Sequence, residues 1–190
     1  MPGARFDRLA RHGAVVAAIA AACTAPAPHH TRPWLFIALD RGPARSRLLA
    51  AMAEAWTADL QGDETADSVI ERRLRKSDHL LARAPVLIIP AVRLTGSHAY
   101  PDAERGAAER EMFLLSSGAA VQNLMLALHA QGLASCWVSS TLFCKEETRE
   151  ALGLEEEWIP LGSIAAGRPP PGDPPPPRPP LDVTDFLRLP

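Results

Sequence analysis

The strongest pattern of apolar residues lies in the middle of the chain, between residues 114 and 133. Its apolar positions recur at helical spacings of three, four and seven residues: Leu114, Val121, Leu124, Met125 and Leu128. Because the residues between them are also mostly small or apolar, we predict a buried central helix. Gly132 follows it, at the place where a left-handed C-terminal cap is expected. Residues 135–140 then suit a short strand, and this helix–strand unit fits plain packing as well as a functional platform.

Other apolar runs predict an α/β core around this helix. We expect helices over residues 14–24, 43–60, about 69–81 and 145–152, and strands over residues 34–39, 86–92 and 158–167. The strand at residues 86–92 is apolar throughout, which indicates a strand covered on both faces. The loop at residues 25–33 is rich in turn residues. The loop at residues 93–105 is long enough to form a lid or a substrate loop.

Both ends of the chain leave alternatives open. Arg5, Arg8 and Arg11 precede the apolar run 13–23, as in a signal peptide, but an acidic residue within the basic region and the many alanines favour an amphipathic helix. Residues 168–180 are rich in proline and predict an extended arm. The apolar residues beyond it either dock on a partner subunit or form a frayed tail: Leu181, Val183, Phe186 and Leu187.

Composition narrows the class of protein. The chain has 190 residues, of which 47% are apolar, so it is long enough to bury a sizeable core. Its net charge is −2 with both signs interspersed, which argues against nucleic-acid and membrane-surface binding. No apolar run reaches the roughly 18 residues that a membrane span requires. Three cysteines without metal or redox spacing fit a reducing, cytoplasmic compartment.

The chain lacks the common catalytic signatures. It has no phosphate-binding glycine loop, dinucleotide fingerprint, zinc helix or Gly-x-Ser-x-Gly elbow. We predict no metal site, because the side chains of adjacent His29 and His30 diverge on most backbones. Cys144 is expected to be a buried thiol. The basic cluster of residues 72–76 is either a solvated face or an anion site. The remaining loop, hydroxyl-rich strand end and basic arm suit a flat aromatic cofactor that carries a phosphate.

Several segments together resemble a known family. Residues 27–34, Ala-Pro-His-His-Thr-Arg-Pro-Trp, are similar to the Pro-Ser-x-x-Asn-x-Gln-Pro-Trp loop of FMN-dependent nitroreductases, and residues 116–140 resemble their central helix and flavin-contacting strand. Residues 25–33, 97–103 and 133–137 resemble more closely the C-terminal flavin domain of the actinobacterial bifunctional coenzyme F420:L-glutamate ligase. The similarity runs from about Val15 to the C-terminus.

This resemblance implies an α+β, three-layer nitroreductase-like fold that forms a domain-swapped homodimer. Residues 1–168 would be the flavin domain and residues 169–190 an arm that packs on the partner subunit. FMN would be the cofactor and would carry the hydride, so no side chain is expected to be catalytic. The resemblance places these residues at FMN: Pro28, His29, His30, Arg32, Ser116, Trp137, Val138, Ser139, Ser140 and Arg178.

The same resemblance implies reduction of dehydro-F420-0 in coenzyme F420 biosynthesis. The small anionic deazaflavin-type substrate would meet His98, Tyr100, Arg105, Arg75 and Lys76. The family opens with an Arg-Arg-Ser-x-Arg element that grips the phosphate, whereas Arg5, Arg8 and Arg11 are spaced differently, which predicts weaker FMN binding. Two alternatives follow: a non-catalytic module that binds F420 or a flavin, and a general NAD(P)H nitroreductase.

Overall fold

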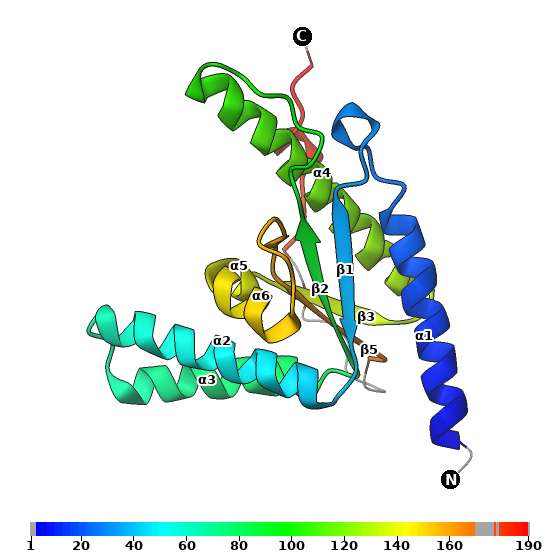
Figure 1. The fold of residues 1–190 in the computed structure, drawn as a ribbon. Coiled ribbons are helices and arrows are strands. Elements are labelled where there is room, and N and C mark those ends of the chain that lie inside the picture. Colours follow the sequence, from blue (N-terminus) through cyan, green and yellow to red (C-terminus); the bar gives the residue numbers. More distant parts are fainter. Residues whose placement is uncertain (1–2, 170–176, 178, 190) are drawn as a thin grey trace.

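The protein folds into three layers, with one sheet between two layers of helices (Figure 1). The computed structural model describes residues 3–169, 177 and 179–189, and the side chains among them from residue 13 onward. The five-stranded sheet has the order β1-β2-β5-β3, β4 also pairs with β2, and these pairings are antiparallel. Its strands are β1 (Trp34–Leu39), β2 (Val86–Val92), β3 (Ala134–Val138), β4 (Ile159–Pro160) and β5 (Ser163–Gly167).

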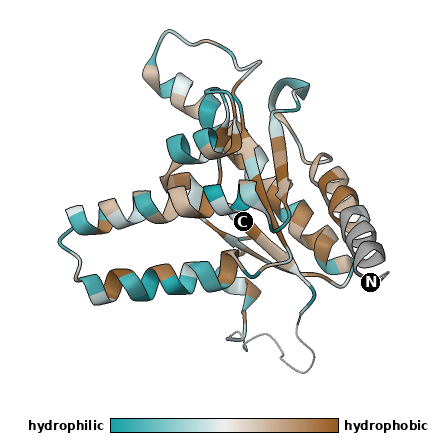
Figure 2. Cartoon of the chain, turned by 60° about the horizontal axis from the view of Figure 1, so that its bottom comes forward, coloured by the Kyte–Doolittle hydropathy of each residue, from teal (hydrophilic) through white to brown (hydrophobic). Residues whose placement is uncertain are grey.

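Helices connect and cover these strands. The α-helices are α1 (Gly3–Ala22), α2 (Pro43–Gly62), α3 (Asp67–Leu81), α4 (Ala103–Ala130), α5 (Ser140–Phe143) and α6 (Lys145–Leu152). Two short 3-10 helices are η1 (Pro28–His30) and η2 (Val183–Asp185). The strands are mostly hydrophobic, whereas α2 and α3 mix hydrophobic and hydrophilic residues along their lengths (Figure 2). This pattern is typical of helices that cover a sheet on one side and face water on the other.

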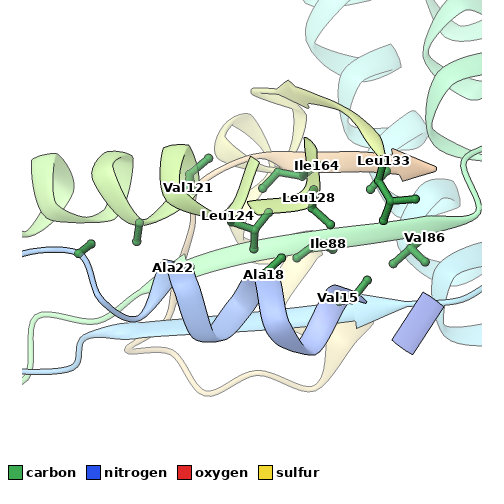
Figure 3. Close-up of a cluster of buried hydrophobic side chains, with 13 residues drawn as sticks. Val15, Ala18, Ala22, Val86, Ile88, Val121, Leu124, Leu128, Leu133 and Ile164 are labelled. Atoms are coloured by element: carbon green, nitrogen blue, oxygen red, sulfur yellow. The ribbon is translucent and has the colours of Figure 1, made fainter. Parts of the chain in front are cut away.

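Strand β2 is the centre of the core, and every residue of it is buried. Successive side chains of a strand point to opposite faces. Val86 and Ile88 accordingly pack with α1 and α4 (Figure 3), while Leu87 and Ile89 pack with α2. The prediction that this strand is covered on both faces is confirmed. In this sheet β2 is antiparallel to β1. Helices α2 and α3 form the long connection between the two strands and cover one face of β2.

Helix α4 is the predicted central helix, and it packs along α1. The fully buried Ala18 and Ala22 of α1 share a cluster with Leu124 and Leu128, since small residues let the two helices approach closely (Figure 3). At its end, the Leu133 amide donates to the Leu128 carbonyl at 3.0 Å. Gly132 is left-handed there, with φ +73°. The predicted glycine cap is therefore confirmed as a Schellman motif.

One face of α4 has no cover among the described residues. Met112, Leu115 and Leu126 are 42%, 74% and 56% exposed. By length and composition alone α4 could cross a bilayer, a test that core helices of globular proteins also pass. Since its opposite face packs in the core, we interpret the exposed face as a contact surface rather than a membrane span.

A buried arginine fixes the base of the α2–α3 hairpin. Arg45 is 2% exposed, and its Nη1 donates to the Ala84 carbonyl at 2.8 Å. Its Nη2 donates to the Leu81 carbonyl, and Arg41 donates to the Arg83 carbonyl. These bonds satisfy backbone groups that the end of α3 leaves open. Burial lowers the pKa of the Arg45 guanidinium.

The structure corrects several predicted boundaries. Helix α1 begins at Gly3 rather than near residue 14, so the basic segment belongs to it. The strand predicted over residues 135–140 ends at Val138, because Ser140 begins α5. The strand predicted over residues 158–167 is two strands, divided at Gly162. The loop predicted over residues 93–105 ends earlier, because α4 begins at Ala103.

The C-terminal arm is described only in part. Arg178 and most of the proline run lie outside the described residues. Beyond them, Leu181, Phe186 and Leu189 are 76%, 76% and 80% exposed. The tail therefore carries large apolar side chains that the rest of this chain does not bury.

Candidate functional site

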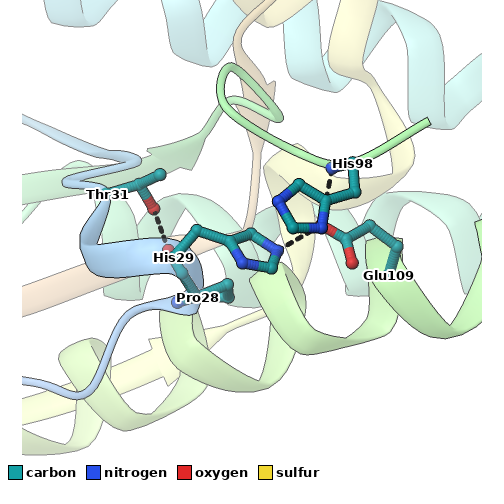
Figure 4. A network of polar contacts seen from close by, with 5 residues as sticks. All are labelled: Pro28, His29, Thr31, His98 and Glu109. Atoms are coloured by element: carbon teal, nitrogen blue, oxygen red, sulfur yellow. Dashed lines mark hydrogen bonds and ion pairs between the residues drawn. The ribbon is translucent and has the colours of Figure 1, made fainter.

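A buried carboxylate gathers two loops at the first half of α4. Glu109 is 4% exposed, and its Oε1 accepts a hydrogen bond from the His98 amide at 2.9 Å (Figure 4). The same oxygen lies 2.7 Å from Nε2 of His29. Glu109 thus joins the loops at residues 25–33 and 93–102, which are far apart in sequence. The hydrogen bond from His98, followed by that with His29, lowers the pKa of the Glu109 carboxyl.

The imidazole rings of His29 and His98 stack above this carboxylate. Their centroids are 3.9 Å apart with 21° between the planes, and Phe113 lies 6.4 Å from the His29 ring. His29 and His30 both have left-handed backbones, with φ of 52° and 54°. Two such residues in succession are uncommon outside glycine, and such strain tends to cluster at functional sites.

The turn itself is held by two hydroxyl groups. Thr31 Oγ1 donates to the Pro28 carbonyl at 2.7 Å, and Ser116 Oγ donates to the Pro26 carbonyl at 2.7 Å. Ser116 is therefore buried beneath the loop, where it positions the backbone. The His29 side chain is engaged with Glu109, whereas His30 and Arg32 are exposed. His30 and Arg32 are therefore exposed loop side chains outside the cluster around Glu109.

Three predicted substrate residues lie together beside this cluster. The His98 ring is 6.5 Å from the Tyr100 ring, and the Arg105 guanidinium lies 5.3 Å above Tyr100. Asp102 caps α4 by accepting from the Arg105 amide at 2.9 Å, and it pairs with Arg105 Nε at 2.5 Å. These contacts lower the pKa of the Asp102 carboxyl. His98, Tyr100 and Arg105 thus lie in one region, and their contact with a substrate stays a prediction.

A second region is a cavity of about 570 Å³ between α2, α3 and the end of β3. It contains four of the predicted site residues, namely Val138, Ser139, Ser140 and Lys76. The sequence assigned the first three to the cofactor and the fourth to the substrate. The walls between them are mainly apolar or aromatic: Leu49, Met52, Trp56, Leu74, Leu80 and Phe143. A mostly apolar cavity of this size with a few polar groups is typical of small-molecule sites.

Gly162 packs against the strand end that lines this cavity. Its amide donates to Thr141 Oγ1 at 3.1 Å, and the neighbouring Leu161 carbonyl accepts from Trp137 Nε1 at 3.1 Å. Its φ is +116°, and a Cβ at this position would lie 2.6 Å from both Trp137 Nε1 and the Val138 carbonyl oxygen. Only glycine therefore fits. Ser140 contacts the first residue of β5, because its hydroxyl donates to Ser163 Oγ at 3.0 Å.

Within one chain, the predicted substrate residues on α3 lie far from those on the loop at residues 93–102 (Figure 1). Arg75 is exposed and pairs with Glu71 at 3.1 Å, apart from the cavity. Helix α3 and the loop at residues 93–102 lie at opposite ends of the molecule (Figure 1). Cys144 is buried as predicted, and burial raises the pKa of its thiol, as expected for an inert cysteine.

Sequence reasoning missed Glu109, although a signal for it exists. Glu109 precedes Phe113 by four residues and Ser116 by seven, so it lies in the helical register of the buried face of α4. Extending the apolar stripe towards the N-terminus would have placed a carboxylate in the core. Arg45 has no comparable signal, because an arginine within an amphipathic helix is normally exposed.

Comparison with known proteins identifies the family. A model of the Nitroreductase family matches residues 11–168. The chain belongs to the nitroreductase family. Among solved structures, this nitroreductase-family chain resembles a BluB-like flavoprotein from Clostridium difficile 630, with a TM-score of 0.72 and 20% identity over 93% of this chain and 88% of the other.

The names of two further similar solved structures mention FMN. One is described as a nitroreductase in complex with FMN from Desulfovibrio desulfuricans, with a TM-score of 0.66 and 22% identity over 94% of this chain and 84% of the other. The second is the FMN and NADPH-dependent nitroreductase NfnB from Sphigopyxis sp. strain HMH, with a TM-score of 0.64 and 18% identity over 94% and 89%. At these identities the likeness shows the fold, so the nitroreductase-like α+β prediction is confirmed.

The first prediction concerns Gly162. We expect Gly162→Ala to lower the free energy of unfolding by at least about 2 kcal/mol, because the new methyl group meets Val138 and Trp137. Gly153→Ala is the matched control: Gly153 has φ +65° with open space around it, so its loss should be only about 1 kcal/mol. Urea unfolding followed by circular dichroism measures both. Equal losses would contradict a close contact at Gly162.

Proposed function

We propose that this chain is an FMN-dependent oxidoreductase that works as a homodimer. The observation that carries the proposal is the cavity of about 570 Å³, which holds the strand end at Val138, Ser139 and Ser140 in a chain of the nitroreductase family. Solved relatives with the same fold are named for FMN. The resemblance of this strand end to the flavin-contacting strand of the family and its place in a cavity of suitable size support the same site.

The apolar walls and the hydroxyl groups of this cavity suit a flat flavin ring. When bound, FMN supplies hydride transfer, and the protein supplies position and electrostatics. Trp56, Phe143 and the leucine side chains offer apolar surface to a flat ring. Lys76 and Arg73 bring positive charge, but Asp59, Asp63 and Asp78 line the same cavity, so its charged side chains taken together do not favour an anionic ring. Ser139 and Ser140 add hydroxyl groups and fix orientation.

Filling the cavity tests this assignment. We expect Leu80→Trp to weaken FMN binding by at least about tenfold, because the larger side chain occupies the cavity. Leu142→Trp is the matched control: both leucines are 37% exposed, but Leu142 does not line the cavity. Quenching of FMN fluorescence on titration measures both affinities. Equal affinities would place the flavin elsewhere, and an absence of flavin binding by the unaltered protein would overturn the proposal.

A second copy of the chain would complete the site. In one chain the His30 turn and the cavity belong to different regions, yet the family resemblance assigns both to FMN. The exposed apolar face of α4, with Leu115 74% exposed, offers a surface for self-association. The apolar tail residues Leu181 and Phe186 offer a second contact. A partner docked on α4 would bury these side chains, and its turn would have to reach around the sheet to the cavity, which lies in the opposite helix layer.

A charge on this face should therefore prevent both assembly and binding. We expect Leu115→Glu to convert the dimer to a monomer and to weaken FMN binding by at least about tenfold, since burying an unpaired carboxylate is costly. Light scattering after size-exclusion chromatography measures the mass. Ala58→Glu, at an exposed position on α2, is the control and should leave the dimer intact. A Leu115→Glu protein that stays dimeric would rule out this interface.

For the substrate, we propose reduction of dehydro-F420-0 in coenzyme F420 biosynthesis, in the cytoplasm. The resemblance of residues 25–33, 97–103 and 133–137 supports this assignment. His98, Tyr100 and Arg105 offer hydrogen bonds and a cation to an anionic deazaflavin. The mainly apolar walls of the cavity instead favour the alternative of a general NAD(P)H nitroreductase that accepts small nitroaromatics.

Turnover assays distinguish these substrates. With FMN-loaded protein and a chemical reductant, we expect dehydro-F420-0 to be converted to its saturated product, as mass spectrometry would show by a gain of two hydrogens. NADPH oxidation with a nitroaromatic compound, without that conversion, would select the nitroreductase alternative. Tight binding of F420 without any turnover would indicate a non-catalytic binding module.

A further inference from the structure

The cluster of His29, His98 and Glu109 offers three metal-ligand groups from three elements. One donor atom from each residue lies within 4.8 Å of the others. His29 comes from the left-handed turn η1, His98 from the loop before α4, and Glu109 from α4 itself. The family resemblance assigns His29 to FMN and His98 to the substrate, but it gives Glu109 no role and assigns no metal to any of the three. The expectation of no metal site rested on the adjacent pair His29 and His30 alone.

We infer that His29, His98 and Glu109 form a binding site for a divalent transition-metal ion such as Zn²⁺. Two imidazoles and one carboxylate are a ligand set that zinc and related ions use in proteins, with the remaining positions open to water or a ligand. Mg²⁺ and Ca²⁺, which prefer oxygen ligands, are disfavoured by the two nitrogen donors.

The surroundings of the carboxylate support this assignment. Glu109 is 4% exposed, and the His98 amide holds its Oε1 at 2.9 Å. Ligating carboxylates are commonly oriented by such an outer hydrogen bond. Glu109 Oε1 and His29 Nε2 lie 2.7 Å apart, so two of the three groups already meet in a hydrogen bond. An ion would take the place of this hydrogen bond and bind both groups.

Binding requires one side chain to move. The rings of His29 and His98 are stacked at 3.9 Å with 21° between their planes, so their lone pairs do not converge on one point. His98 belongs to an exposed loop. Rotation about its side-chain torsions directs a ring nitrogen towards the carboxylate while its backbone amide stays in place. The ion would then fix the loops at residues 25–33 and 93–102 to α4.

The test uses the full-length protein after treatment with a chelator. Isothermal titration calorimetry with Zn²⁺ measures the affinity and the number of ions bound, and thermal unfolding measures the melting temperature with and without Zn²⁺. The exposed thiols of Cys23 and Cys136 are competing zinc ligands, so all variants carry Cys23→Ser and Cys136→Ser. We expect about one Zn²⁺ per chain and a rise in melting temperature. His98→Ala should reduce the affinity at least about tenfold. Because its backbone amide still donates to Glu109, this variant keeps the fold.

Matched histidine variants decide the location. His79→Ala and His129→Ala remove exposed imidazoles outside the cluster and should leave affinity unchanged. Co²⁺ provides a second readout, since its visible absorption should show nitrogen and oxygen ligation that disappears in His98→Ala. No saturable binding, or equal affinity in His98→Ala and His79→Ala, overturns the inference. Neither result depends on whether FMN binds.

Discussion

The structure depends on the burial of a helix that is apolar on nearly all sides. One face of α4 packs between α1 and the sheet, where Leu124 and Leu128 are fully buried. The alanines of α1 let the two helices approach closely, and the alternating side chains of β2 connect this cluster to the opposite layer. The part of the chain that the structure describes leaves the remaining face uncovered, and Leu115 stays exposed on it. The requirement that stabilises the fold is thus also the reason to expect a second copy.

In its first turns, α4 buries a carboxylate, Glu109, at a position where an apolar side chain would be expected. Burying Glu109 is unfavourable unless hydrogen-bond donors surround it. The His98 amide and the His29 ring provide these donors, so two loops that are distant in sequence are brought to one place. The polar group therefore organises the loops in the way that the apolar groups organise the helices. Function is expected at such a place, because the loops are positioned by rigid neighbours.

Much of the architecture could be predicted because its signals are local. Apolar spacing located the helices, the uninterrupted apolar run located β2, and Gly132 marked the end of α4. Boundaries failed where a single backbone conformation decides, as at Gly162, which divides the last strand in two. The site was harder to predict, since the pairing of His29 with Glu109 spans 80 residues. The cavity places Lys76 with Ser139, but no local pattern separates Lys76 from Arg75, which lies one residue away and pairs with Glu71 in solvent.

Two arginines hold the base of the hairpin of α2 and α3. Arg45 and Arg41 donate to carbonyl groups at the end of α3 and just after it. These bonds lie at the end of the hairpin that is next to the sheet, where the chain passes from β1 to α2 and from α3 to β2. The opposite turn, at residues 61–64, is exposed. The two helices are therefore joined at both ends, by the arginine hydrogen bonds at one end and by the chain itself at the other. If the cavity widens to admit a ligand, the hairpin would have to move as one unit, so access would depend on how firmly the buried arginine holds its base.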